Sequence, residues 1–196
     1  EFTEAQEKYQ EALDIRRELA RSNPQTYLPD VATTLNNLAV LLSDRNEFTE
    51  AQEKYQEALD IRRELARSNP QTYLPDVATT LNNLAVLLKA RNEFTEAQEK
   101  YQEALDIYRE LARSNPQTYL PDVAMTAANF SRSYLTSGRN REESLKLARE
   151  AVVSVLPFFE NVPAAGQYLR FALAIVKEWG EDEDKFLKDC MDEIKN

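Results

Sequence analysis

The string EFTEAQEKYQEALDI begins at Glu1 and recurs without change from Glu47 and from Glu93. The three copies are therefore separated by a constant period of 46 residues. Residues 1–46 and 47–92 differ at only two neighbouring positions, which read Ser43-Asp44 in the first copy and Lys89-Ala90 in the second. A fixed period of this length is typical of repeat proteins, in which each unit packs against its neighbours. The sequence therefore predicts an array of stacked units.

The first half of each repeat is expected to form a helix from about Pro29 to Asp44. A proline followed by Asp30 suits a helix start, where the first amides have no partner inside the helix and negative charge is favoured. Apolar residues recur at spacings of three and four, which is the helical period. They are Val31, Leu35, Leu38, Ala39, Leu41 and Leu42.

The second half of each repeat is expected to form a longer helix that begins after Asn46. The segment Thr49–Gln52 has the pattern of a capping box. The helix is expected to end before Pro70, because proline lacks an amide proton and restricts the residue before it. Its apolar stripe consists of Ala51, Tyr55, Ala58, Leu59, Ile61, Leu65 and Ala66. The segment SNPQTYLPDVA then connects one repeat to the next.

The composition argues against several classes of function. The chain has three glycines and no histidine, and its net charge is −10. Without histidine, serine–histidine triads and most zinc sites are excluded, and no glycine-rich phosphate-binding loop is present. A negative chain repels the phosphates of nucleic acid. No apolar run is long enough for a membrane-spanning helix. We therefore predict a protein that is not an enzyme, without cofactor, metal, nucleic acid or membrane.

The carboxylates and the single cysteine have simple structural explanations. Most carboxylates are expected on the solvated faces of amphipathic helices, as in the pair Glu50–Lys54. Cys190 lies on an apolar stripe and is expected to behave as a small apolar residue. Its acidic neighbours Asp189, Asp192 and Glu193 are expected to raise the pKa of its thiol.

The repeat resembles the tetratricopeptide motif over about residues 1–155. The matching positions are Leu35, Leu38, Ala39, Leu42, Ala51, Tyr55 and Ala58. The long period and the string LNNLA resemble repeats of kinesin light chain and of many bacterial arrays. The resemblance implies an all-α, right-handed superhelical solenoid of antiparallel helix pairs, with about nine helices. We expect residues 1–157 to form the array and residues 158–196 a continuous, helical C-terminal cap.

Asparagines are the candidate binding residues. An asparagine in the middle of a helix is unfavourable, so a pair of them there needs a use. The resemblance implies that first helices line a concave groove and that asparagines at one motif position hold a ligand. In this chain that position is occupied by Asn37, Asn83 and Asn129, and their neighbours Asn36 and Asn82 are further candidates. The alternative is that these side chains bridge neighbouring helices, and the sequence leaves both open.

Differences between the repeats fall on the same expected surface. Val40 and Val86 become Arg132 in the third repeat, and Ser43 is replaced by Lys89. These five residues complete the predicted ligand-binding set. Drift near the C-terminal cap explains the third-repeat changes equally well.

The leading hypothesis for function is a cytoplasmic scaffold that binds a peptide or protein segment in the groove. One alternative is a structural spacer or self-assembly module that stacks end to end. Another is the sensory arm of a larger bacterial signalling protein. Residues 1–23 form a second helix without its own first helix. We expect that end either to contact another chain or to be the cut edge of a longer array.

Overall fold

The computed structural model describes residues 2–137, 140–159 and 164–195. Within these ranges all regular secondary structure is helical, with nine α-helices and one short 3-10 helix. The predicted all-α class and the approximate number of helices are therefore confirmed for the described part of the chain. The chain forms two compact units, Glu1–Arg91 and Asn92–Asn196.

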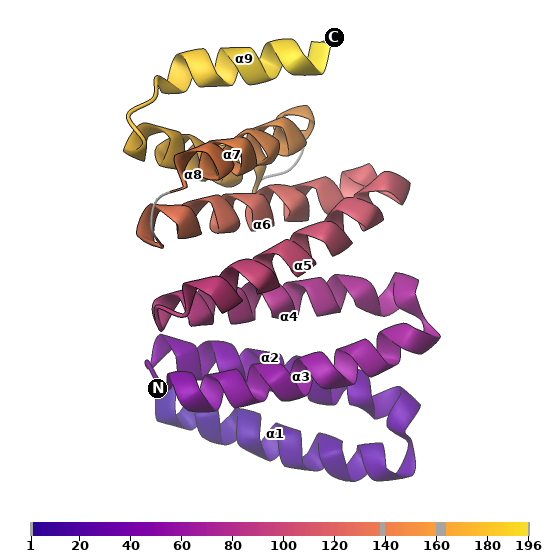
Figure 1. The fold of residues 1–196 in the computed structure, drawn as a ribbon. Helices are drawn as coiled ribbons and strands as arrows, with labels where there is room; N and C mark the ends of the chain where they lie inside the picture. The colour runs from indigo at the N-terminus through magenta and orange to yellow at the C-terminus, as the bar shows by residue number, and fades with distance from the viewer. Residues whose placement is uncertain (1, 138–139, 160–163, 196) are drawn as a thin grey trace. The chain divides into compact units, whose positions relative to one another are not determined.

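The first unit contains four α-helices of equal length (Figure 1). They are α1 (Phe2–Ser22), α2 (Pro24–Asp44), α3 (Phe48–Ser68) and α4 (Pro70–Ala90). Each helix packs against the next one along the chain, and α2 also contacts α4. The first helices of successive repeats therefore lie beside each other.

The second unit continues the alternation of helices and ends in a shorter pair. Its elements are α5 (Phe94–Ser114), α6 (Pro116–Thr136), α7 (Arg141–Val155), the 3-10 helix η1 (Leu156–Phe158), α8 (Ala165–Glu178) and α9 (Glu183–Lys195). Helix α6 contacts α5, α7 and α8, and α9 packs on α7 and α8. Helices α8 and α9 lie in the predicted cap region, but the division of the chain at residue 157 stays a prediction.

The helix start predicted at Pro29 is wrong. Helix α2 begins at Pro24, and the side chain of Asn23 caps it by accepting a hydrogen bond of 3.3 Å from the amide of Thr26. Pro29 lies inside the helix, near its start. Because proline has no amide proton, only the backbone hydrogen bond to Gln25 O is lost. The expected connection is therefore mostly helical, because an asparagine cap followed by proline outweighs the later proline.

The capping box predicted at Thr49–Gln52 is also wrong. Helix α3 begins at Phe48 after Glu47, whose side chain makes no capping hydrogen bond. The chain turns instead at Asn46, which has a left-handed φ of 63°, and the amide of Glu47 then donates to Leu42 O at 2.9 Å. Asparagine tolerates this conformation, so the turn satisfies the end of α2 through the backbone.

Small side chains let the helices of a repeat approach closely. Ala39, Ala51 and Ala58 have no exposed surface, while Leu38 and Tyr55 are 1% and 3% exposed. Alanine permits short distances between helix axes, and the larger side chains fill the remaining space. These are the positions that the apolar spacing predicted for the core.

One buried polar contact between second and first helices changes along the chain. Arg62 of α3 is 5% exposed and donates to the hydroxyl of Thr80 and, at 3.1 Å, to Asp76 O. In the second unit the corresponding residue is Tyr108. There the buried hydroxyl of Thr126 has no hydrogen-bond partner among the described residues.

This difference predicts different effects of one substitution at two equivalent sites. Thr80→Val removes an acceptor from a buried guanidinium and should lower the free energy of unfolding by about 1.5–3 kcal/mol. Thr126→Val removes a hydroxyl without a partner and should be neutral or should raise that energy by up to about 1 kcal/mol. Urea unfolding followed by circular dichroism measures both. Equal losses at the two sites would contradict the assignment.

Candidate functional site

The first helices of the first unit share a partly exposed stripe. On α2 the stripe consists of the exposed residues Thr33, Asn37 and Val40, with Val40 38% exposed. On α4 the equivalent residues are Thr79 and Asn83, which are half-buried, and Val86, which is 45% exposed. Because α2 and α4 are in contact, the two stripes form one surface. We call these six residues the first-helix face.

The asparagines divide into buried and accessible members. Asn36 and Asn82 are only 7% and 4% exposed, whereas Asn37 is exposed and Asn83 is half-buried. Successive residues of a helix point about 100° apart, so adjacent asparagines meet different surroundings. The predicted pairs therefore do not form a single uniform ligand surface.

A chain of side-chain amides links the two helices. Asn83 Nδ2 on α4 donates to Asn36 Oδ1 at 3.4 Å, and Asn36 Nδ2 donates to Asn37 Oδ1 at 3.5 Å. Both bonds are long, so each is weak. They give Asn36 and Asn83 the bridging role that the sequence left open as the alternative. Asn37 ends the chain of amides with its Nδ2 donating to no group among the described residues. The role of these asparagines in ligand binding stays a prediction.

Other groups on or near the first-helix face are already engaged locally. The hydroxyls of Thr33 and Thr79 donate to Pro29 O and Pro75 O, each at 2.9 Å. Ser43 and Lys89 are half-buried in the last turns of α2 and α4, at the edge of the face. The middle of the face therefore consists of the asparagines and valines.

The corresponding surface of the second unit carries a different residue at the valine position. Asn129 of α6 is half-buried, and Arg132 is exposed at the position equivalent to Val40 and Val86. The Arg132 guanidinium lies 5.3 Å from the ring centroid of Phe171 on α8. This contact is a cation–π interaction, so Arg132 helps to hold α8 against α6. The repeat pattern did not predict this contact, because Phe171 lies outside the repeated sequence.

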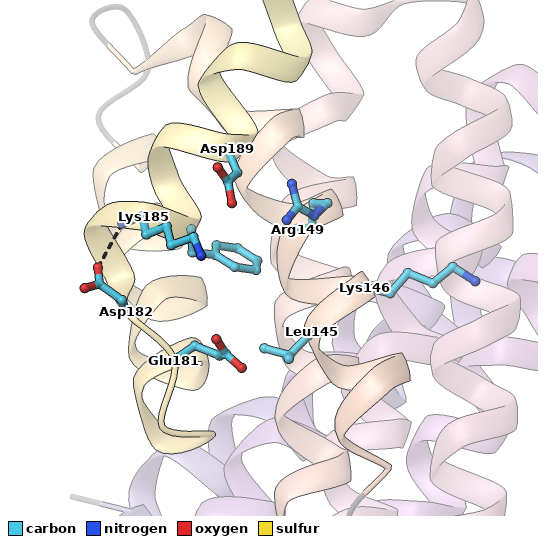
Figure 2. A pocket seen from close by; sticks show the side chains of 8 residues that line it. Leu145, Lys146, Arg149, Glu181, Asp182, Lys185 and Asp189 are labelled. Carbon is cyan, nitrogen blue, oxygen red and sulfur yellow. Dashed lines mark hydrogen bonds between the residues drawn. The ribbon is translucent and has the colours of Figure 1, made fainter.

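A separate pocket lies in the second unit between α7 and the start of α9 (Figure 2). It has a volume of about 360 Å³. Figure 2 shows Arg149 from α7 facing α9 while Lys146 points away. The pocket is lined by Leu145, Lys146, Arg149, Glu181, Asp182, Lys185, Phe186 and Asp189.

The charged groups of this pocket hold α9 in place. Arg149 lies 4.9 Å from the ring centroid of Phe186, and its Nη1 is 3.5 Å from a carboxylate oxygen of Glu193. Asp182 accepts a hydrogen bond of 2.9 Å from the amide of Lys185, at the start of the helix. These contacts give Arg149, Phe186 and Asp182 structural roles. The repeat pattern could not reveal the contacts of Arg149, because Phe186 and Glu193 lie far along the chain on α9.

Cys190 of α9 is fully buried, as the apolar stripe predicted. Burial raises the pKa of its thiol most, Glu193 and Asp189 raise it further, and Arg149 opposes them. The expected direction is therefore confirmed, but its main cause is burial and not the acidic neighbourhood. Among the described residues no group of three potential metal ligands occurs, and none of the helices there could span a membrane.

Antiparallel helix pairs that repeat every 46 residues define a helical repeat protein. The family model described as tetratricopeptide repeat matches residues 1–64 and 30–110, which together cover more than half of the chain. The chain therefore belongs to the tetratricopeptide repeat family, as the resemblance implied. Members of this family generally mediate interactions between proteins.

Two solved structures match this chain. The crystal structure of BtubC (BKLC) from P. vanneervenii is 18% identical, with 99% of this chain and 89% of that chain covered and a TM-score of 0.50. A de novo designed helical repeat protein, DHR64, is 8% identical, with 97% and 98% covered and a TM-score of 0.39. The first likeness concerns the fold alone. A search of curated proteins found no match.

Substitutions of two adjacent asparagines distinguish Asn36, which bridges α2 and α4, from the accessible Asn37. Asn36→Ala should lower the free energy of unfolding by about 1 kcal/mol, because it removes a buried amide that bonds to Asn83. Asn37→Ala should change that energy by less than about 0.5 kcal/mol, because the side chain is exposed. Urea unfolding of both variants tests the difference. A larger loss for Asn37→Ala would refute the division.

Proposed function

We propose that the chain binds an extended segment of another protein on the first-helix face of α2 and α4. The observation that carries this proposal is the exposure of Asn37 and Val40 on α2, beside Asn83 and Val86 on α4. A side-chain amide can donate to and accept from a peptide group, so it suits the backbone of an extended ligand. The valines would contact apolar side chains of that ligand.

The arrangement of amides supports this proposal. Asn36 is buried and donates a long, weak hydrogen bond to Oδ1 of its neighbour Asn37, which favours one orientation of that amide. An amide that is oriented before binding loses less freedom when a ligand arrives. Asn37 keeps its donor group on the surface, three residues before the exposed Val40. One helix thus offers a polar and an apolar contact about one turn apart.

Charge restricts the class of ligand. The chain carries a net charge of −10 and the exposed middle of the first-helix face has no charged side chain. A strongly acidic ligand would be repelled by the protein as a whole, and nothing on the face would compensate. We therefore propose a neutral or basic segment with an apolar residue for the valines.

Peptide arrays test the proposed function directly. Random 15-residue peptides are screened against the chain, and the affinity of each binder is measured by fluorescence anisotropy. Combining Asn37→Ala with Val40→Ser and Val86→Ser removes the amide and the apolar contacts without adding charge, and it should weaken binding by at least about tenfold, or about 1.4 kcal/mol. All three residues are exposed, Val40 by 38% and Val86 by 45%, so the fold should persist.

A matched control places changes on a second helix. Glu53→Gln and Gln56→Ala alter exposed positions of α3 and should leave the affinity unchanged. Circular dichroism confirms that both sets remain folded. Equal affinities for the face variant and the control would rule out the first-helix face as the binding site. End-to-end self-association, a cytoplasmic location and a role in a larger bacterial signalling protein stay predictions.

A further inference from the structure

The first two repeats differ only in the last turn of their first helices. The differing pairs are Ser43-Asp44 in α2 and Lys89-Ala90 in α4. Each pair lies three and four residues after the exposed valine of the first-helix face. Side chains at these spacings are neighbours on the surface of a helix. The one place where the two repeats differ is therefore beside the proposed binding surface, and we call these four residues the variable edge.

The variable edge reverses its charge from one repeat to the next. Asp44 is exposed, so α2 presents a negative charge there. Lys89 is half-buried and brings a positive charge to the equivalent turn of α4. Helices α2 and α4 are in contact, so the two charges border one continuous surface. Two neighbouring helices with otherwise equal sequences thus differ in the sign of one charge.

Helix stability does not account for both pairs. The helix dipole favours a cation in the last turn of a helix and disfavours an anion there. Lys89 therefore suits the end of α4, whereas Asp44 weakens the end of α2. Because the preceding residues of the two helices are identical, they give no local reason for the acid. An exposed acid that weakens its own helix is better explained by a contact with another molecule.

We propose that the variable edge decides which part of the bound segment lies on α2 and which part lies on α4. This proposal rests on the proposed function and deepens it. The asparagines and valines of the first-helix face offer nearly the same contacts twice, so they do not by themselves distinguish the two helices. The reversed charges do distinguish them. A basic side chain of the segment pairs with Asp44, and an acidic side chain pairs with Lys89.

The separation of the two helices sets the separation of those charges in the ligand. Asn83 Nδ2 lies 3.4 Å from Asn36 Oδ1, so α2 and α4 are direct neighbours here, and the axes of such helices are about 8–10 Å apart. A polyproline II segment advances about 3.1 Å per residue and returns to the same side after three residues, which is about 9 Å. The expected ligand is therefore an extended segment with a basic and an acidic residue three positions apart.

Two peptides of equal composition test this ligand class. One contains Lys-Val-Pro-Glu-Val, the other contains Glu-Val-Pro-Lys-Val, and both have the same glycine–serine flanks. The natural chain should bind one of them at least about fivefold more tightly, because one order gives two attractive pairs and the other gives two repulsive ones. Fluorescence anisotropy measures both affinities. The preference should disappear at about 1 M salt, where the screening length is only about 3 Å. Absence of binding by both peptides would show that the ligand class is wrong.

Exchanging the differing pairs between α2 and α4 provides the sharpest comparison. The exchanged chain carries Ser43→Lys, Asp44→Ala, Lys89→Ser and Ala90→Asp. Each pair already occurs at the end of an otherwise identical helix in this protein, so the fold should persist. The exchanged chain should prefer the opposite peptide by a similar factor. An unchanged preference, or equal binding of the two peptides by the natural chain, would overturn the proposal.

Two further variants separate this proposal from the proposed function. The combination of Asn37→Ala, Val40→Ser and Val86→Ser should weaken the preferred peptide by at least about tenfold, because it removes the contacts of the face. The control with Glu53→Gln and Gln56→Ala, at exposed positions of α3, should leave both affinities and their ratio unchanged. Face-dependent binding without a preferred order would refute the role of the variable edge alone. Binding that is insensitive to the face variant would instead contradict the proposed function.

Discussion

The structure depends on close contact between helices whose facing residues are small. Ala39, Ala51 and Ala58 are completely buried, so that Leu38 and Tyr55 can fill the space between α2 and α3. A helix of this kind cannot bury its apolar surface alone, and its stability comes from its neighbours. The same surface is therefore core in one repeat and accessible in another, depending only on which helix lies beside it.

This constraint explains which features the sequence could predict. The apolar period identified the helix pairs and their core residues, because burial at spacings of three and four requires no knowledge of distant partners. The helix ends were harder. Pro29 and Thr49–Gln52 both have the local pattern of a helix start, yet Asn23 with Pro24 begins α2 earlier and the left-handed Asn46 places the start of α3. Where two local patterns each indicate a helix start, the backbone conformation of the whole turn decides which residue begins the helix.

The surroundings of the candidate residues were predictable only in part. Repetition drew attention to the asparagine pairs, of which Asn36 on α2 and Asn83 on α4 are joined by a hydrogen bond. Whether Asn36 or Asn37 faces solvent depends on the rotation of the helix about its axis and on the position of the neighbouring helix. The repeat period alone predicts neither. Arg132 shows the same limit, because its partner Phe171 lies on α8, outside the repeated sequence.

Helices α1 and α3 have identical sequences but different surroundings. In α3 the residues equivalent to Ile15 and Leu19 contribute to the packed array, while in α1 they remain exposed. No property of the side chains distinguishes the two cases, so the exposure of these residues is set by the helices beside them and not by a special motif. Identity between repeats therefore predicts the same helix in each copy, whereas the burial of a residue also depends on the neighbours of that helix.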